Sequence, residues 1–146
     1  MQADFYLLES GGPELALAPL AGKVLETGGR LLVVAGEAEQ RERLSQALWS
    51  AGAESFLANG VAGGEHDERQ PILIAGELAP ANGARFLALA DGVWREPGEG
   101  VFDRVLLVFG EAERIPARET WRLLKGREDW ACRFFRREAG RWTQAG

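Results

Sequence analysis

The sequence predicts an α/β fold in which a mostly parallel central sheet is covered by helices on both faces. Short apolar runs alternate along the chain with segments of helical period, and glycines separate most of them. Residues 31–35 are continuously apolar, which is typical of a strand that is buried on both faces of a parallel sheet. With 146 residues, 46% of them hydrophobic, the chain has the size and composition of one domain spanning residues 1–146.

The first strand and helix are predicted within residues 3–29. Residues 3–8 have the apolar and aromatic character of a strand, and the turn Ser10-Gly11-Gly12-Pro13 follows them. The helix that comes next ends near Gly28 and Gly29. Pro19 lies either in the first turn of a helix that begins near residue 18 or at a kink in a longer helix. The first alternative is preferred, because proline is tolerated in the first turn.

The central strand at residues 31–35 is followed by a predicted amphipathic helix at residues 37–49, which ends at Gly52. Leu44, Ala47 and Leu48 are expected to face inward, and the residues expected to face water are Glu37, Glu39, Arg41, Glu42 and Arg43. A short strand is possible at residues 54–57. The glycine-rich residues 60–69, which include His66, are expected to form a mobile loop.

The second half of the chain supplies the remaining strands and a basic helix. Apolar runs at residues 72–75, 85–90 and 103–109 are predicted strands. Pro116 suits the first position of the next helix, and Gly126 suits its end. Residues 130–137 show the alternation of side chains with a period of two that is typical of a strand. This strand is expected to close the sheet.

A basic stripe is the most distinctive feature of the last third of the chain. Arg118, Trp121, Arg122 and Lys125 are spaced so that helical geometry places them on one side of the predicted helix. Residues 114–146 carry nine Lys and Arg against four Asp and Glu, whereas residues 1–113 carry eight against eighteen. A basic stripe beside an aromatic residue suggests a docking site for a small anionic partner. A plain solvated helix face remains the alternative.

Composition excludes several classes of protein. The net charge of −5 opposes direct binding to nucleic acid, which usually requires a basic surface. No stretch approaches the roughly 20 apolar residues of a membrane helix, and the N-terminus lacks the pattern of a signal peptide. With one cysteine, Cys132, the chain cannot form an internal disulfide. These features lead us to expect a cytoplasmic protein with no membrane partner.

The motifs that bind nucleotide cofactors are missing. Gly22-Lys23 is followed by Val24 rather than by the Ser or Thr of a phosphate-binding loop. Gly11-Gly12-Pro13 does not supply the three spaced glycines of the dinucleotide fingerprint. The sequence therefore predicts no nucleotide-binding loop and no cofactor.

The other candidate chemical groups have simpler structural interpretations. His66 lies between Glu65 and Asp67, so a solvated loop residue is favoured over a general base. Cys132 is favoured as a core residue over a nucleophile. The acidic groups at residues 37–39 and 65–68 resemble a helix start and a soluble loop, so no metal site is predicted. Trp49 and Phe56 are first expected in the core, and their exposure would indicate an interface.

The ordered set of segments resembles the chi subunit of bacterial DNA polymerase III holoenzyme nearly from end to end. The matching pieces are Phe5-Tyr6-Leu7-Leu8, Ala47-Leu48-Trp49, Glu54-Ser55-Phe56, Gln70-Pro71-Ile72-Leu73-Ile74, Phe102-Asp103-Arg104-Val105, Ala117-Arg118-Glu119-Thr120-Trp121-Arg122 and Gly140-Arg141-Trp142. The resemblance implies a three-layer Rossmann-like domain without a nucleotide. It also implies a non-catalytic accessory subunit associated with the clamp loader.

Members of that family bind the acidic C-terminal tail of single-stranded DNA-binding protein (SSB), which ends in a Phe carboxylate preceded by Asp residues. Such a tail requires a guanidinium for its carboxylate, an apolar pocket for its ring and diffuse positive charge for its aspartates. By position, the resemblance assigns carboxylate pairing to Arg118, the pocket wall to Trp121 and attraction of the aspartates to Arg122. Helical geometry adds Lys125, and Phe109 is a further candidate for the pocket wall.

The resemblance also implies a second protein partner near Trp49 and Phe56, either the psi subunit or a repair helicase. Family members often have a Pro-His pair soon after the matching phenylalanine, whereas this chain reads Leu57-Ala58-Asn59-Gly60. The identity of this partner is therefore left open. The alternative function is a small α/β enzyme or nucleotide-binding protein that uses the carboxyl edge of the sheet.

Overall fold

The computed structural model describes residues 1–8, 12–51, 57–138 and 141–146. In these residues one eight-stranded sheet forms, with strands β1 (Gln2–Leu7), β2 (Leu31–Val34), β3 (Asn59–Val61), β4 (Ile72–Ala75), β5 (Phe86–Leu89), β6 (Arg104–Phe109), β7 (Ala131–Glu138) and β8 (Arg141–Gln144). The strand order is β3-β4-β2-β5-β6-β1-β7-β8, and every neighbouring pair is parallel except β7 with β8. The predicted mostly parallel sheet is confirmed.

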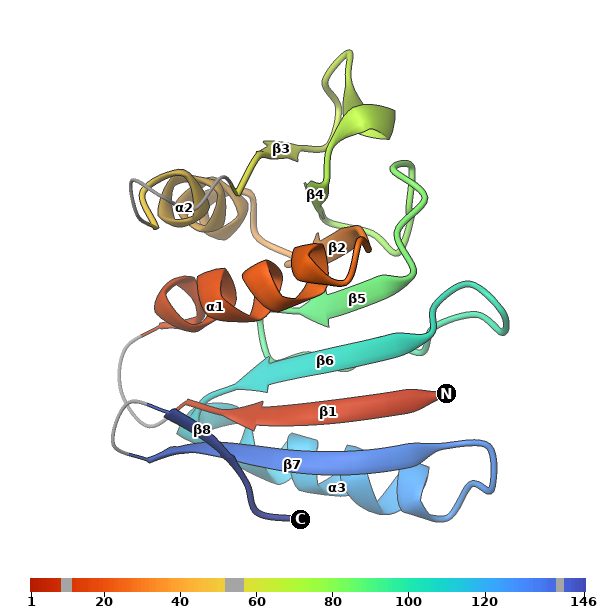
Figure 1. Cartoon of the computed structure of the whole chain (residues 1–146). Coiled ribbons are helices and arrows are strands. Elements are labelled where there is room, and N and C mark those ends of the chain that lie inside the picture. Colours follow the sequence, from red (N-terminus) through yellow and green to blue (C-terminus); the bar gives the residue numbers. More distant parts are fainter. Residues whose placement is uncertain (9–11, 52–56, 139–140) are drawn as a thin grey trace.

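Helices cover both faces of this sheet, which confirms the predicted three-layer α/β architecture (Figure 1). Helices α1 (Pro13–Glu26) and α2 (Ala38–Trp49) pack on one face, and α3 (Arg114–Lys125) packs on the other. Strand β2 lies between β4 and β5, as expected for a central strand. Its Val33 belongs to the core under α1 and α2, whereas Leu32 and Val34 belong to the opposite core, so the apolar run is buried on both sides.

The first helix begins earlier than predicted. It starts at Pro13, whose fixed φ suits the first turn, and Pro19 lies inside it rather than at its beginning. A proline within a helix removes the hydrogen bond to the carbonyl four residues before, here that of Leu15. Leu15 is 71% exposed, so water can reach this part of the helix and satisfy the freed carbonyl. The cost of Pro19 is thereby reduced.

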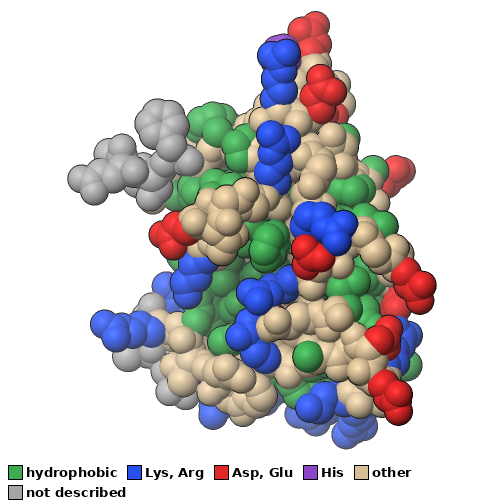
Figure 2. Space-filling model, turned by 45° about the vertical axis from the view of Figure 1, so that its right-hand side comes forward, with side chains coloured by type: hydrophobic (Ala, Val, Ile, Leu, Met, Phe, Trp, Pro, Cys, Tyr) green, Lys and Arg blue, Asp and Glu red, His purple; other side chains and the backbone are tan. Residues whose placement is uncertain are grey.

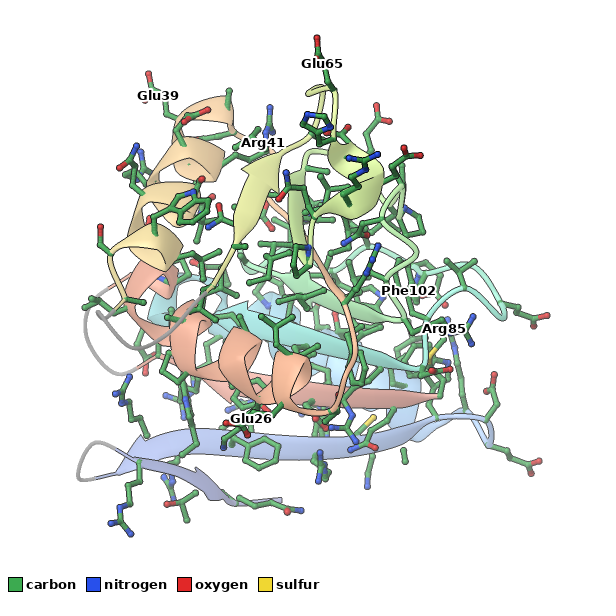
Figure 3. All side chains as sticks on the ribbon, turned by 45° about the horizontal axis from the view of Figure 1, so that its top comes forward. Glu26, Glu39, Arg41, Glu65, Arg85 and Phe102 are labelled. Atoms are coloured by element: carbon green, nitrogen blue, oxygen red, sulfur yellow. The ribbon has the colours of Figure 1, made fainter. Side chains whose placement is uncertain are left out.

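The region around α2 agrees with the prediction except at one residue. Leu44 and Leu48 are buried and Ala47 is half-buried as expected, but Arg41 turns back and donates to the carbonyl oxygen of Ala35 at 2.8 Å (Figure 3). The predicted helix end at Gly52 and most of the possible strand at residues 54–57 lie outside the described residues.

An unpredicted strand, β3, begins at Asn59 and includes the first two residues, 60 and 61, of the segment expected to be a loop. The Asn59 side chain is buried, accepting a hydrogen bond from Ser45 Oγ at 2.6 Å and donating to the Leu57 carbonyl at 2.9 Å. These contacts attach a short polar strand to α2. Residues 67–69 of the same segment form a short 3₁₀ turn.

The C-terminal third also contains corrections. Helix α3 begins at Arg114, so Pro116 lies in its first turn rather than at its first position, and Gly126 caps its end as predicted. Strand β7 does not close the sheet, because β8 pairs with it antiparallel at the edge. Strand β8 is four residues long and only its Trp142 is a large apolar residue, so it carries little sequence signal. Tertiary packing of Trp142 against Tyr6 compensates for this.

A buried carboxylate helps to place β1 between β6 and β7. Asp4 is 1% exposed, and Arg133 of β7 donates two hydrogen bonds to it at 2.8 and 2.9 Å. Arg104 of β6 approaches the same carboxylate at 3.8 Å from the other side. A buried charge must be paired, and each neighbouring strand supplies one of its cations. This arrangement favours the observed strand order over alternatives that separate these residues.

An aromatic cluster packs next to this ion pair. Tyr6 stacks on Phe135 with ring centroids 4.8 Å apart and meets Trp142 edge-on at 5.0 Å. Burial of the phenol, together with the nearby negative charge of Asp4, raises the pKa of Tyr6 to about 12.

The chain has one tyrosine, so its phenolate absorbance reports this group alone. We expect the folded protein to titrate with a midpoint near pH 12 and the denatured protein near pH ~10. Because folding favours the neutral phenol, this contribution to stability is present below pH ~10 and is lost as the pH rises toward the folded pKa. Spectrophotometric titration in buffer and in denaturant measures both midpoints. A single midpoint near pH ~10 in both solutions would contradict the burial of Tyr6.

Candidate functional site

The site is built on α3, whose apolar side turns toward the sheet. Ala117 and Leu124 are buried. Trp121 lies between them along the same side of the helix and is half-buried. Arg114 and Arg118 precede Trp121 by seven and three residues, so helical geometry places them along the margin of this apolar side. This margin lies over the part of the sheet where β1, β6 and β7 are neighbours.

A pocket of about 300 Å³ opens between α3 and the sheet. Strands β1, β6 and β7, helix α3 and the segment after β8 all contribute to it, and its lining residues are Phe5, Leu7, Phe109, Arg114, Ala117, Arg118, Trp121, Phe134, Ala145 and Gly146. Apart from the two arginines, the lining side chains are apolar. The pocket therefore combines an apolar interior with two guanidinium groups.

Packed aromatic rings hold the pocket in shape. Phe5 is 1% exposed and meets Trp121 edge-on with centroids 5.2 Å apart. On its other side Phe5 meets Phe109 at 6.5 Å, also edge-on. Edge-to-face contacts at these separations are favourable, so the three rings support one another. The pocket is consequently preformed rather than dependent on a ligand to open it.

The two pocket arginines differ in their electrostatic surroundings. Arg114 pairs with Glu111 at 3.0 Å, and both groups are exposed to solvent. For Arg118, the structure shows no ion pair within the described ranges, and the residue is exposed. Its guanidinium donors are thus available to an incoming anion at the rim of an apolar pocket.

Three of the five residues predicted for tail binding are brought together here. Arg118, Trp121 and Phe109 all line the pocket. Arg122 does not line it, because consecutive residues of a helix point about 100° apart and Trp121 takes the inward direction. Lys125 lies one turn beyond, with its ammonium 5.4 Å from the Trp121 ring centroid.

Several lining residues were not identified as site residues from the sequence. Arg114 was missed because the helix was expected to start at Pro116, although its spacing of four from Arg118 would have placed it on the same side. Phe5, Leu7 and Phe134 carry strand signals, but nothing in the sequence shows that their strands are neighbours under α3. Ala145 and Gly146 carry no recognisable signal.

The distribution of charge agrees with the site. Residues 114–146 have nine Lys and Arg against four Asp and Glu. In Figure 2 most of the blue Lys and Arg side chains that are visible lie in the lower half of the molecule, where Figure 1 places β7, β8 and α3. This part of the molecule therefore attracts anions despite the net charge of −5.

The predicted second interface is only partly described. Trp49 is 56% exposed at the end of α2, so its assignment to the core is wrong. Phe56 lies outside the described residues. Leu15 of α1 is 71% exposed, and a groove of about 700 Å³ runs between α1 and α2 near it. Leu15 lines this groove together with Ala47 of α2, whereas Trp49 is not among the lining residues. Each exposed apolar side chain is a candidate contact for a protein partner.

The remaining candidates are His66, Cys132 and the acidic groups. His66 is exposed in its loop, as predicted, and Cys132 is half-buried against the core under α3. Burial raises the pKa of the Cys132 thiol, which disfavours the reactive thiolate. Glu39 and Glu65 point outward in Figure 3, and in the described ranges no three metal-ligating side chains cluster. No described helix is long and apolar enough to cross a membrane.

Comparison with known proteins agrees with the resemblance found in the sequence. The family model of the DNA polymerase III chi subunit, HolC, matches residues 1–129. A search of curated proteins finds no match. The matched part contains the pocket residues Phe5, Phe109, Arg118 and Trp121 and ends just before β7. Because the match spans most of the chain, this protein belongs to the family of DNA polymerase III chi subunits, which are accessory subunits of the replicative polymerase.

Proposed function

We propose that this protein binds the acidic C-terminal tail of SSB in the pocket between α3 and the sheet, and thereby links SSB to the polymerase and its clamp loader. The observation that carries this proposal is the guanidinium of Arg118, which makes no ion pair with any described residue and lies at the rim of a preformed apolar pocket. The terminal phenyl ring enters the pocket beside Trp121 and Phe5. The terminal carboxylate pairs with Arg118, and Arg114 lies close enough in the same lining to assist. This role places the protein in the cytoplasm with the replication machinery.

The dimensions of the pocket support a short anchor. Its volume of about 300 Å³ is at the lower end of the range of roughly 300–1,000 Å³ for ligand sites. Such a pocket suits one aromatic side chain rather than a long buried segment. The residues that precede the terminal phenylalanine then lie on the surface, where charge decides how strongly they are held.

Lys125 and Arg122 supply that charge outside the pocket. Both are exposed residues of α3, and Lys125 lies over the ring of Trp121. Attraction between exposed charges is screened within about 8 Å at physiological ionic strength. We therefore assign these two residues to attraction of the aspartates, with an effect that is mainly on the association rate and on its salt dependence.

The proposal is tested by titrating the protein with a synthetic peptide of four aspartates followed by a phenylalanine with a free carboxylate. Isothermal calorimetry at low and high salt measures the affinity. We expect saturable binding that weakens with salt and that is lost when the carboxylate is converted to an amide. A second peptide ending in alanine tests the aromatic requirement. Equal binding of the acid and amide peptides would overturn the proposal.

The surface at Trp49 is proposed to bind a second protein, the psi subunit or a helicase, and to connect the chain indirectly to the clamp loader. Its support is the exposed Trp49 and Leu15 on neighbouring helices. Tryptophan is enriched among residues that dominate interface energies. The surface lies on the face of the sheet opposite α3, so both partners can bind at once.

Replacing Trp49 with alanine is expected to leave folding intact, because the side chain is mostly exposed. The free energy of unfolding should change by less than about 0.5 kcal/mol, as measured by urea denaturation. Binding to the second partner should fall by at least about thirtyfold, the range for a dominant interface residue. Tail-peptide affinity serves as the control and should be unchanged. A large loss of stability would show that Trp49 is a packing residue.

A further inference from the structure

The outer edge of β7 beside the pocket presents backbone groups that have no partner within residues 1–8, 12–51, 57–138 and 141–146. In a strand, the N–H and carbonyl of one residue point to the same side, and consecutive residues alternate. Ala131 donates its N–H to the Met1 carbonyl at 2.9 Å, so the backbone N–H and carbonyl groups of the odd-numbered residues of β7 point toward β1. Phe134 pairs outward, donating to the Gly146 carbonyl at 3.2 Å and accepting from the Ala145 N–H at 2.8 Å. The backbone N–H and carbonyl of Cys132 therefore point outward as well, away from β1.

Nothing in the described part of the chain pairs with the backbone of Cys132 on this side. Strand β8 covers residues 135–138 of β7, and residues 145–146 extend the pairing to Phe134. Among the described residues, none pairs on this side with the first three residues of β7, 131–133. An uncovered strand edge is a template for an added strand.

The free edge is continuous with the pocket. Phe134 and Gly146, the last pair before the edge becomes free, both line the pocket. The Cys132 side chain belongs to the same core as Phe134 and Trp121, and the charge of Lys125 acts on its thiol. A chain leaving the pocket along α3 toward Lys125 would therefore run beside Cys132.

The positions of the charges indicate the direction and length of such a chain. Arg114 and Arg118 lie in the first half of α3, and Lys125 is its last residue. A peptide whose carboxylate is held by Arg118 extends its upstream residues toward Lys125, parallel to β7. Glu128 and Asp129 are exposed in the turn before β7 and would repel acidic residues farther upstream. The added segment is therefore short.

We propose that an acidic peptide anchored in the pocket adds its upstream backbone to the free edge of β7, with one peptide carbonyl accepting from the Cys132 N–H and one peptide N–H donating to the Cys132 carbonyl. This inference rests on the proposed function, because the pocket supplies the anchor. It adds a recognition element that does not depend on the side chains of the partner. The backbone pairing sets the position of the peptide along the edge, and Lys125 then selects acidic residues.

The test uses the peptide of four aspartates and a phenylalanine, with each aspartate amide N-methylated in turn. In parallel pairing with one residue of β7, only one peptide N–H donates to the strand. We expect methylation of one aspartate amide to weaken binding at least about fivefold, as loss of a backbone hydrogen bond implies. Methylation of the amides on either side should change affinity less than about twofold. These neighbouring peptides are matched controls for composition and charge.

Amide hydrogen exchange of the ¹⁵N-labelled protein supplies an independent measurement. The Cys132 N–H should exchange quickly in the free protein and become protected in the complex, whereas the Phe134 N–H should be protected in both.

The outcomes separate the two proposals. If the unmodified peptide fails to bind, or binds regardless of its terminal carboxylate, the proposed function is wrong and this inference falls with it. If binding depends on the carboxylate but all four methylated peptides bind equally and the Cys132 N–H stays unprotected, only the strand addition is overturned.

Discussion

Replacing Arg118 with alanine is expected to weaken tail-peptide binding about tenfold, the largest effect of any single charge in the site. A hydrogen bond to a charged group contributes about 1.5–3 kcal/mol, whereas an exposed ion pair contributes at most about 1 kcal/mol. Arg118 is exposed in the free protein but borders an apolar pocket, so the peptide ring would remove water from one side of the pair. The expected loss of binding free energy therefore lies near the lower end of the range for a hydrogen bond to a charged group. Calorimetric titration at two salt concentrations measures it.

The Arg122→Ala variant is the matched control for that measurement. It removes the same charge from the same helix, but Arg122 does not line the pocket. We expect a loss of about threefold or less, which disappears at high salt because exposed charges are screened. The loss from Arg118→Ala should persist in part at high salt. Equal losses from the two variants would show that diffuse charge, rather than a carboxylate contact at Arg118, accounts for binding.

Replacing Phe5 with alanine is expected to destabilise the protein by about 3–5 kcal/mol, the cost typical of truncating a fully buried aromatic residue. Phe5 is 1% exposed and supports the rings of Trp121 and Phe109 in edge-on contacts. Its loss leaves a cavity in the core and removes one side of the pocket. Urea denaturation should show the fall in stability, and the surviving folded protein should bind the tail peptide more weakly.

Two further variants separate packing from binding. Leu73→Ala truncates a fully buried residue of β4 in the core on the same face as Phe5, but Leu73 does not line the pocket. It should cost about 2–5 kcal/mol without changing the affinity of the folded fraction. Phe5→Leu is milder and keeps the protein folded if Phe5→Ala does not. Unchanged peptide affinity in both Phe5 variants would remove Phe5 from the site.

Elements with a strong local pattern were predictable from the sequence, and short polar ones were not. The buried strands β2 and β4 are continuous apolar runs, and β6 is one after its first residue, Arg104, so burial on both faces is visible in the sequence. Strands β3 and β8 have three and four residues and depend on tertiary contacts, through Asn59 in the first and Trp142 in the second. Such contacts have no local signature. The start of α1 was misplaced because the exposure of Pro19, which makes an internal proline tolerable, is also a tertiary property.

The residues of the candidate site were also only partly predictable from the sequence. Helical spacing alone brings Arg118 and Trp121 to neighbouring positions, since both lie within one turn of α3. It could not show that Trp121 turns inward while Arg122 turns away, because this depends on which side of the helix meets the sheet. It also could not identify Phe5 and Phe134, which reach the pocket only through the pairing of β1 with β7.

By itself, the sequence determined the α/β class, the buried central strands and a helix that carries cations beside a tryptophan, because these follow from periodicity and composition over a few turns of chain. The tertiary structure alone decided the pocket. It depends on β1 lying between β6 and β7, a pairing of segments about a hundred or more residues apart in which the buried Asp4 is neutralised from both sides. Burial and charge pairing across such distances are properties of the folded chain, and they convert a basic helix into a site with an apolar interior.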